Sequence, residues 1–283
     1  MRILTDEKIE RILKCPICQA KMTASTERGS LICEGSRGHC YDFAASGYVN
    51  LCAPTQSGGG DSKQAVRARS SFLDKEYYRP VAKALANVAK KYGNSSDILL
   101  DAGCGEGYYS SFFANEGFSV IGVDLSKFAV DAASKRLSKG GTDNFLFATA
   151  SVFDLPVEDC SVDVLTNIFA PCAEDEYKRV LKNDGVLAVA WAGENHLLGL
   201  KEAIYQTARK NDGRADMPSG MEKIDEFQVS YKIELKSEEE IKNLFAMTPY
   251  YWRTSATDVE KLNGMSELVT DVDIMISVFK KRL

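Results

Sequence analysis

The segment Leu99–Tyr109, with the sequence Leu-Leu-Asp-Ala-Gly-Cys-Gly-Glu-Gly-Tyr-Tyr, constrains the fold more than any other part of this chain. Its apolar run gives way to three alternating glycines, and helix-compatible residues follow, as at a turn between a strand and a helix. Gly103, Gly105 and Gly107 let the backbone bend sharply and approach a ligand where a Cβ would collide. The segment therefore predicts a nucleotide-binding turn after a strand at residues 97–100.

Three carboxylates around this turn indicate what kind of nucleotide binds. Asp124 follows a second predicted strand, at residues 119–123, at the usual distance after the glycines for accepting hydrogen bonds from ribose hydroxyls. Asp101 opens the glycine turn and Glu106 lies inside it. Carboxylates suit a cationic ligand better than a pyrophosphate, which needs backbone N–H donors at a helix start. We therefore expect an adenosine-type cofactor that carries positive charge.

Strands and helices alternate over residues 81–191, which predicts an α/β fold with a doubly wound parallel sheet, and further elements follow this core. Ser126 is expected to cap one helix, and Ser237 and Glu240 to form a capping box on another. Helices are predicted at residues 81–92, 109–116, 127–138, 174–181, 197–210 and 237–245. Further strands are predicted at residues 145–148, 162–167, 186–191, 227–235 and 273–279, with a polar loop at 211–220.

At 283 residues, of which 45% are hydrophobic, the chain is long enough to bury a full α/β core and to carry one small extra module. No signal peptide is apparent, and no apolar run approaches the roughly 18 residues of a membrane span. We therefore expect a cytoplasmic protein without a membrane partner.

The cysteines predict a metal site near the N-terminus. Cysteines of a cytosolic chain are expected to be reduced or to bind metal. Cys15-Pro-Ile-Cys18 places two thiolates on one ion, and Cys33 with either His39 or Cys40 completes four ligands. Such a closed set is typical of structural zinc, whereas a redox Cys-x-x-Cys pair needs no further ligands. Zinc would also compensate for the small apolar surface that about fifty residues can bury.

A basic segment follows this module. Residues 53–63 are rich in glycine and serine and predict a linker or mobile loop. Residues 62–92 carry eight lysines and arginines, Arg67 and Arg69 among them, against two acids, although the whole chain has a net charge of −5. The segment is predicted to face phosphates; the alternative is a solvated helix face.

A candidate catalytic loop follows the strand at 162–167. Ligands of a doubly wound sheet lie at the carboxyl ends of its strands, so Asn167 and the next residues should face the reacting group. Phe169, Ala170 and Pro171 offer an aromatic ring that can stack on a planar base and carbonyls that can orient it; the alternative for Phe169 is core packing. Cys172 is a less favoured nucleophile, because no neighbouring base is identifiable.

The Asp-x-Gly-x-Gly-x-Gly form of the turn resembles the first motif of class I S-adenosylmethionine methyltransferases. Over nearly its whole length the chain resembles the bacterial large-subunit ribosomal RNA guanine-N1 methyltransferases with an N-terminal zinc module. The matching residues are the Cys15/Cys18/Cys33/His39 set, Tyr41-Asp42-Phe43, Gly47-Tyr48-Val49-Asn50-Leu51, Gly60-Asp61, Ala68-Arg69, Phe72-Leu73-Asp74, residues 101–109, Ala170-Pro171-Cys172, Met247-Thr248-Pro249 and Trp252.

The resemblance implies methyl transfer from S-adenosylmethionine to N1 of a guanine in a 23S rRNA hairpin, with the zinc module assisting RNA recognition. It favours His39 as the fourth zinc ligand, although Cys33 and His39 are two residues further apart than expected. It implies a zinc module at residues 1–52, a linker and basic segment at 53–80, and a methyltransferase domain at 81–283. A homodimer is compatible with this organisation, and the family branch is left open.

The resemblance also implies the site residues. The cofactor-binding set is Asp101, Gly103, Gly105, Glu106, Gly107, Asp124, Leu125, Ser151, Val152 and Asn167. Ser151 stands where many class I enzymes have an acid. The candidate acceptors of the guanine N1 proton are water, a carbonyl near Ala170, Glu174 and, less favoured, His196. The rival functions are a small-molecule methyltransferase and a non-catalytic zinc-containing RNA-binding protein.

Overall fold

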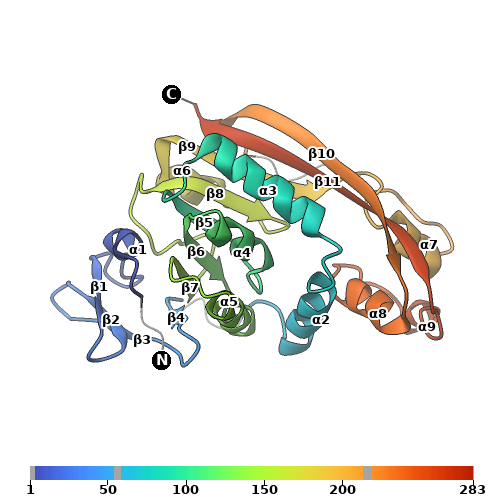
Figure 1. Cartoon of the computed structure of the whole chain (residues 1–283), viewed down its shortest axis with the longest axis horizontal. Coiled ribbons are helices and arrows are strands. Elements are labelled where there is room, and N and C mark those ends of the chain that lie inside the picture. The colour runs from blue at the N-terminus through green and yellow to red at the C-terminus, as the bar shows by residue number, and fades with distance from the viewer. Residues whose placement is uncertain (1–3, 54–58, 213–217, 283) are drawn as a thin grey trace.

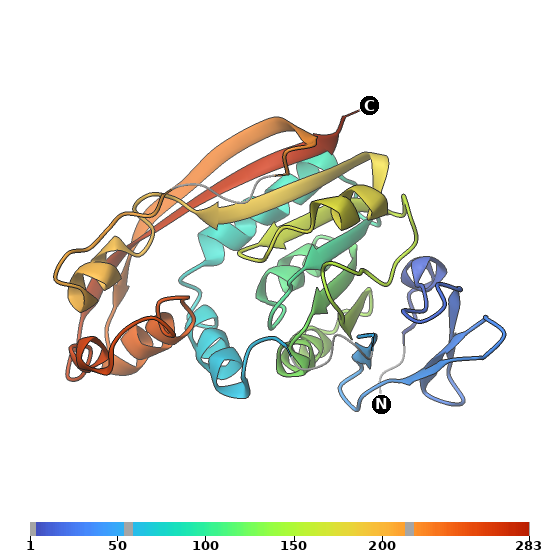
Figure 2. The ribbon, with the colours of Figure 1, turned by 180° about the vertical axis from the view of Figure 1, so that it is seen from behind.

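The computed structural model of this chain describes residues 4–53, 59–212 and 218–282. These residues form a small N-terminal module and a large mixed sheet with helices on both faces (Figure 1). Helices α7 (Leu198–Ile204), α8 (Glu238–Ala246) and α9 (Ala256–Glu260) lie at the end of the molecule opposite the module in both ribbon views (Figures 1 and 2).

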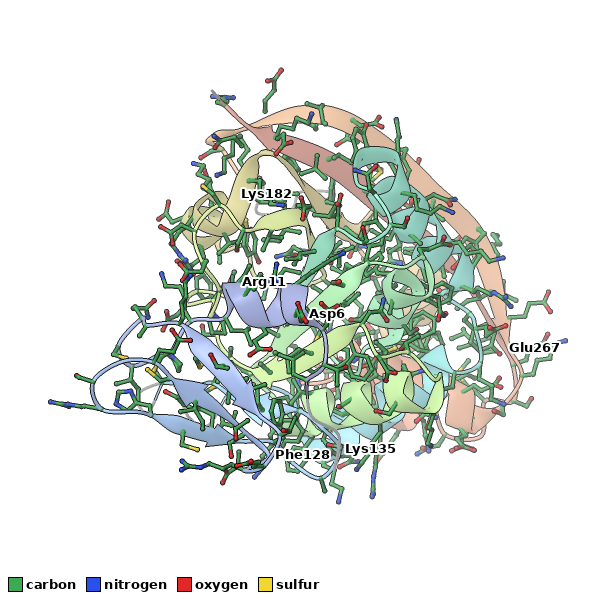
Figure 3. All side chains as sticks on the ribbon, turned by 60° about the vertical axis from the view of Figure 1, so that its left-hand side comes forward. Asp6, Arg11, Phe128, Lys135, Lys182 and Glu267 are labelled. Carbon is green, nitrogen blue, oxygen red and sulfur yellow. The ribbon has the colours of Figure 1, made fainter. Side chains whose placement is uncertain are left out.

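The N-terminal module begins with helix α1 (Glu7–Ile12). Asp6 caps it by accepting hydrogen bonds from the backbone N–H groups of Lys8 and Ile9 (Figure 3). A small antiparallel sheet follows, made of β1 (Met22–Ser25), β2 (Ser30–Cys33) and β3 (Cys40–Asp42). The loop before β1 and the turn between β2 and β3 bring Cys15, Cys18, Cys33 and His39 to one end of the module.

The module shares a core and a sheet with the rest of the protein. Buried Ile9 and Leu13 belong to the same apolar cluster as Leu100 and Val157. The short strand β4 (Val49–Asn50) leaves the module and pairs in parallel with β7 at the edge of the main sheet. Shared packing thus crosses the boundary predicted at residue 52.

The main sheet has eight strands in the order β10-β11-β9-β8-β5-β6-β7-β4. Its parallel strands besides β4 are β5 (Ile98–Ala102), β6 (Ser119–Asp124), β7 (Phe145–Thr149), β8 (Val162–Ile168) and β9 (Leu181–Ala192). The order reverses at β5, so the carboxyl ends of β5 and β8 mark the switch point, where doubly wound folds bind ligands in a crevice.

The predicted parallel sheet is confirmed for β5 to β9, whereas β11, whose direction the sequence did not predict, runs against these strands. β11 (Leu268–Lys281) runs antiparallel between β9 and β10 (Met221–Leu235). The segment between them, which contains α8 and α9, leaves and returns at the same end of the sheet, and such a connection produces an antiparallel pair. β10 is an edge strand whose side chains are largely exposed.

Helices cover both faces because the central strands are apolar on both sides. One face packs under α3 (Arg79–Tyr92), α4 (Tyr108–Asn115) and α5 (Lys127–Lys139), which belong to one buried cluster. The other face packs under α6 (Glu174–Val180) and the N-terminal module, which belong to a second cluster.

The predicted caps are confirmed in part. Ser126 accepts a hydrogen bond from the backbone N–H of Ala129, as expected. Ser237 likewise accepts from the N–H of Glu240. The reciprocal half of the capping box is wrong, because the Glu240 carboxylate accepts from the N–H of Lys236, one residue before the cap.

Two segments differ more strongly from the prediction. Within the predicted linker and basic segment, residues 63–73 form helix α2 (Lys63–Leu73), which packs against α5 and α8. The helix predicted at 197–210 ends at Ile204. Parts of the predicted linker at 53–63 and loop at 211–220 fall on residues 54–58 and 213–217, outside the described residues.

The basic segment is not a free phosphate-facing patch. Five of its eight cations lie within 4 Å of acidic side chains: Arg69, Lys75, Arg79, Lys90 and Lys91. Nearby acids from elsewhere in the chain were invisible to a count confined to residues 62–92.

Candidate functional site

Four side chains of the N-terminal module converge on one point. The ligand atoms of Cys15, Cys18, Cys33 and His39 all lie within 4.8 Å of one another. The Cys18 and Cys33 sulfurs are 3.2 Å apart, and the Cys15 sulfur is 3.5 Å from Nδ1 of His39. Three sulfurs and one imidazole nitrogen are a donor set of closed, tetrahedral zinc sites. The exposed Cys40 lies outside this group.

Backbone groups around the cluster fit a metal as well. The N–H of Gly35 donates to the Cys33 sulfur at 3.2 Å, which stabilises a thiolate. A Cβ on Gly35 would lie 2.9 Å from the Cys18 sulfur, so the loop closes tightly over the cluster. The Tyr41 hydroxyl lies 3.1 Å from the Cys15 sulfur and adds a further polar contact. The residues present therefore fit a structural zinc ion.

The second site lies at the glycine turn between β5 and α4. Gly103 has φ +82°, and a Cβ there would lie 2.5 Å from Cβ of Ala170. Gly105 has φ +54°, and a Cβ there would lie 3.1 Å from Nη2 of Arg69. The left-handed backbone favours glycine at both positions, and at Gly103 the close approach of Ala170 excludes a Cβ as well. The turn thus brings the predicted catalytic loop and helix α2 against the predicted cofactor site.

Two predicted cofactor-binding acids stand at the ends of adjacent strands. Asp101 is buried, and its two oxygens accept hydrogen bonds from Ser110 at 2.5 Å and Thr166 at 2.9 Å. Burial raises the pKa of Asp101 to about 6. The Asp124 carboxylate accepts from the N–H groups of Gly105 at 3.1 Å and Ser126 at 2.8 Å, which ties the glycine turn to the end of β6.

The polar groups near Asp124 fit an adenosine-type ligand. Thr149 is paired with Asp124 in the register of β6 and β7. The Thr149 hydroxyl is buried and has no hydrogen-bond partner within the described part of the chain. An orphaned hydroxyl costs free energy unless a ligand or water meets it. Together with the acids and the glycine cradle, it makes this crevice suitable for a cationic nucleoside cofactor.

The other predicted cofactor residues line the ends of β6 and β7. Leu125 is partly exposed directly after Asp124. Ser151 and Val152 are buried just after β7, and the Ser151 hydroxyl accepts a hydrogen bond from the N–H of Phe153. Their apolar and backbone groups border the position that an adenine ring takes in such folds.

Hydrogen bonds from the side chain of Asn167 hold the predicted catalytic loop after β8 in place. Asn167 is buried, and its amide donates to the carbonyl of Pro171 at 2.9 Å and to the Tyr177 hydroxyl at 2.7 Å. The Asn167 amide thus holds the loop, and these two hydrogen bonds account for its buried position without a contact to a cofactor. Phe169 has φ +55° and an exposed side chain, so the core-packing alternative for this ring is wrong.

Behind Phe169 lies His196, which sequence reasoning weighed as a base. The two rings are stacked, with centroids 6.2 Å apart. Nδ1 of His196 accepts from the N–H of Asp273 at 3.2 Å, so Nε2 carries the proton and donates to the Tyr78 hydroxyl at 3.3 Å. Burial lowers the pKa of His196 to about 4. The ring is therefore neutral, has both nitrogens engaged, and supports Phe169 instead of accepting a proton.

Glu174 is engaged in the same way. Its carboxylate accepts hydrogen bonds from Lys178 and from the N–H groups of Ser219 and Gly220. The Lys178 hydrogen bond lowers the pKa of Glu174. Neither Glu174 nor His196 is free to take the guanine proton in this conformation.

An exposed aromatic pair lies beyond this region. The Trp252 side chain is 74% exposed and contacts Tyr251 edge to face, with ring centroids 5.0 Å apart. The hydroxyl of the adjacent Tyr250 donates to the side-chain oxygen Oδ1 of Asn211 at 3.1 Å. The side-chain nitrogen Nδ2 of Asn211 donates to the backbone carbonyl of His196 at 3.0 Å. Hydrogen bonds thus connect Tyr250, the residue before this pair, through the Asn211 side chain to His196.

Sequence reasoning missed three contributors to this region. Tyr78, Thr149 and the Arg69 contact with the glycine turn come from segments far from the motif in sequence. Of the three, Arg69 alone carries a local signal: it belongs to the basic segment, which predicts a phosphate contact, and to the Ala68-Arg69 match of the resemblance.

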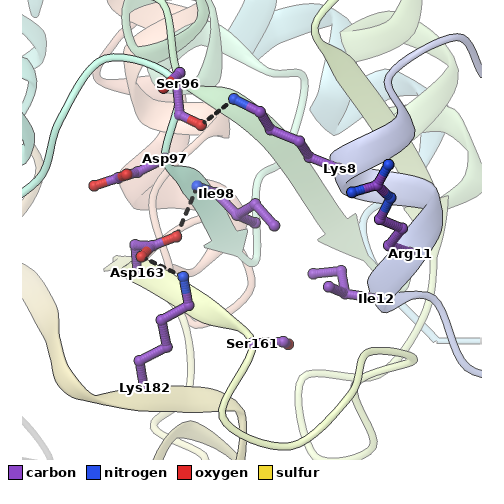
Figure 4. Close-up of a pocket in the computed structure, with 9 residues that line it drawn as sticks. All are labelled: Lys8, Arg11, Ile12, Ser96, Asp97, Ile98, Ser161, Asp163 and Lys182. Carbon is purple, nitrogen blue, oxygen red and sulfur yellow. Dashed lines mark hydrogen bonds and ion pairs between the residues drawn. The ribbon is translucent and has the colours of Figure 1, made fainter.

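A separate cavity lies at the opposite, amino-terminal ends of β5 and β8 (Figure 4). Lys8 of α1 reaches across it to the carbonyl of Ser96 at 2.7 Å, while Asp163 accepts from Lys182 and from the N–H of Ile98. This cavity is part of the contact between the module and the sheet, on the side away from the glycine turn.

Comparisons with known proteins agree with these two sites. Residues 94–247 match the family described as "Methyltransferase domain", and residues 13–57 match the family described as "RlmA, N-terminal", a zinc ribbon. The chain is 29% identical to "Putative 23S rRNA (guanine-N(1)-)-methyltransferase YxjB" of Bacillus subtilis (strain 168), over 94% of this chain and 97% of the relative.

Two further relatives have similar names. The 23S rRNA (guanine(748)-N(1))-methyltransferase of Streptomyces fradiae is 32% identical over 70% of this chain and 69% of its own. "Putative 23S rRNA (guanine-N(1)-)-methyltransferase" of Micromonospora griseorubida is 28% identical over 91% of this chain and 93% of its own. Among the described residues, no helix is long and apolar enough to cross a membrane.

Proposed function

This chain belongs to the family of the 23S rRNA (guanine-N1) methyltransferases, and on that premise we propose that it transfers the methyl group of S-adenosylmethionine to N1 of a guanine in a 23S rRNA hairpin. The observation that carries the proposal is the coincidence, in one chain, of a Cys₃His cluster with an acid-rich glycine turn that adjoins an exposed aromatic loop. A cytoplasmic location accords with a ribosomal RNA substrate.

The residues of the crevice would position the cofactor. When bound, the cofactor supplies a methyl group on a sulfonium centre, already activated for in-line displacement. Asp124 is suited to the ribose hydroxyls, and Leu125, Ser151 and Val152 to the adenine. Asp101 and Glu106 supply the negative field that favours a cationic ligand.

The loop after β8 would position the guanine. Phe169 presents an exposed ring on which a base can stack, and the neutral ring of His196 supports it from behind. Ala170 lies against Gly103, so the two substrates would meet where the loop and the turn touch. Because Glu174 and His196 are engaged, water is left to take the N1 proton to solvent, and the backbone carbonyl of Ala170 can accept a hydrogen bond from N1–H before transfer.

Zinc would hold the N-terminal module in the shape that contacts RNA. We assign Cys15, Cys18, Cys33 and His39 as its ligands, because their donor atoms converge while Cys40 lies apart. The site is closed, so the metal is structural and takes no part in the transfer.

Incubation with labelled S-adenosylmethionine and unmodified 23S rRNA tests the proposal. At a cofactor concentration below saturation, label should enter the RNA with the wild-type protein and enter it much more slowly with Asp124→Ala. Glu267→Ala, which removes an exposed carboxylate far from the turn, should behave as wild type. Label transfer to a small molecule without RNA would favour the metabolite methyltransferase, and RNA binding without any transfer would favour the non-catalytic protein. Sedimentation of the same sample tests the homodimer.

A further inference from the structure

Arg69, in the middle of helix α2, covers the glycine turn instead of facing solvent. Its side chain is 22% exposed, and Nη2 lies 3.1 Å from the position of a Cβ on Gly105. Helix α2 packs between α5 and α8, which brings its buried face toward this turn. The expectation that Arg69 binds RNA phosphate is therefore not supported by its position, whereas Arg67 is exposed on the same helix.

Two carboxylates fix the orientation of the Arg69 guanidinium. Nε donates to Glu106, which is itself buried in the glycine turn, and Nη1 donates to Asp61 at 2.5 Å. Nη2 is the nitrogen left on the side of Gly105. A planar guanidinium held at two of its nitrogens presents the third in a fixed direction.

Asp61 is held close to Asp124, the acid suited to the ribose hydroxyls, through contacts with Ser126. The backbone carbonyl of Asp61 accepts a hydrogen bond from the Ser126 hydroxyl at 2.7 Å. Gly60 has φ +92°, and a Cβ there would lie 2.5 Å from the backbone nitrogen of Ser126. Ser126 also donates its N–H to Asp124. Arg69 thus spans the crevice from the glycine turn to the segment packed against the end of β6.

The charges around the glycine turn indicate which charged group of S-adenosylmethionine Arg69 could bind. Asp61, Asp101, Glu106 and Asp124 are four carboxylates, which match the ammonium and sulfonium groups of S-adenosylmethionine. The same ligand ends in a carboxylate, which these acids repel. Arg69 is the cation that faces the glycine turn from α2, and a guanidinium is well suited to a carboxylate.

We propose that Arg69 binds the α-carboxylate of the methionine half of S-adenosylmethionine. Glu106 and Asp61 orient the guanidinium for this contact and balance its charge when the ligand is absent. The inference rests on the proposed function, because it assumes S-adenosylmethionine as the cofactor. It adds a residue of α2, outside the glycine motif, to the cofactor site.

Calorimetry with S-adenosylmethionine and its decarboxylated analogue tests the proposal, because the analogue lacks only the carboxylate. The wild-type protein should bind S-adenosylmethionine about 10- to 150-fold more tightly than the analogue, the range for charge-assisted hydrogen bonds. Arg69→Gln should reduce this preference to less than about threefold. Arg67→Gln, an exposed arginine on the same helix, should keep it in full.

Each outcome decides a separate point. Equal affinity of the wild-type protein for the two ligands overturns the proposal without any variant, and so does a folded Arg69→Gln protein that keeps the full preference. Arg69→Lys keeps the positive charge but lacks the planar guanidinium, so it should show an intermediate preference for S-adenosylmethionine over the analogue. This variant replaces Arg69→Gln in the test if Arg69→Gln does not fold. Failure of the wild-type protein to bind S-adenosylmethionine at all would contradict the proposed function instead.

Discussion

Gly103→Ala should disturb the cofactor turn and the catalytic loop together. The added methyl group would lie 2.5 Å from Cβ of Ala170, and the alanine would have to adopt φ +82°. A left-handed backbone costs an L-residue roughly 1–2 kcal/mol. Overpacking by one methyl group costs about 1–3 kcal/mol where neighbours must shift. We therefore expect the free energy of unfolding to fall by roughly 2–5 kcal/mol.

The two contributions can be separated because one of them involves Ala170. Gly103→Ala combined with Ala170→Gly removes the steric contact but keeps the backbone strain, so about 1–3 kcal/mol should be recovered. Urea unfolding of the wild type, both single variants and the double variant measures this coupling. The described contact would be refuted if the free energy of unfolding of Gly103→Ala were within about 0.5 kcal/mol of that of the wild type. It would also be refuted if the loss of stability in the double variant equalled the sum of the losses in the two single variants.

Four further predictions address the two sites. His39→Ala should release zinc and Cys40→Ala should retain it, as measured by elemental analysis of the purified proteins; full retention in His39→Ala would contradict the ligand assignment. Asp124→Ala should weaken S-adenosylmethionine binding by about 1.5–3 kcal/mol in calorimetry, and an unchanged dissociation constant would remove its ribose role. The affinity for S-adenosylmethionine should fall as the pH drops below about 6, because a cationic ligand favours ionised Asp101; Asp101→Asn should flatten this profile, and a flat wild-type profile would contradict it. Trp252→Ala should weaken RNA binding by about 1–3 kcal/mol if the exposed ring stacks on a base, and unchanged RNA affinity would exclude that contact.

Local pattern was enough to predict most of the sheet and the glycine turn. Buried strands such as β5 and β6 are continuous apolar runs that end in an acid, and the turn between β5 and α4 needs glycine for reasons visible in the sequence. The same reasoning gives no direction for β11, because that direction depends on where a long connection returns. Direction is a tertiary property that hydrophobic periodicity does not encode.

The site could be predicted where its residues are adjacent in the sequence. The convergence of Cys15, Cys18 and Cys33 follows from spacing. Spacing does not separate His39 from Cys40, whereas the resemblance favours His39 and the fold brings its ring to the three sulfurs. The sequence did not predict the position of Arg69, because Glu106 lies 37 residues away and the close approach of Arg69 to Gly105 arises from the packing of α2. Charge counts along a sequence cannot separate a solvated cation from one already paired.

The position of the methyl group tests the central claim most directly. Methylation at N1 blocks the Watson–Crick edge of guanine, so reverse transcription of 23S rRNA treated with the protein and S-adenosylmethionine should stop at a single guanine in a hairpin. Nucleoside analysis of the same RNA should find 1-methylguanosine. Label in the RNA without such a stop, or a methyl group on another atom or base, would contradict the proposed guanine-N1 activity.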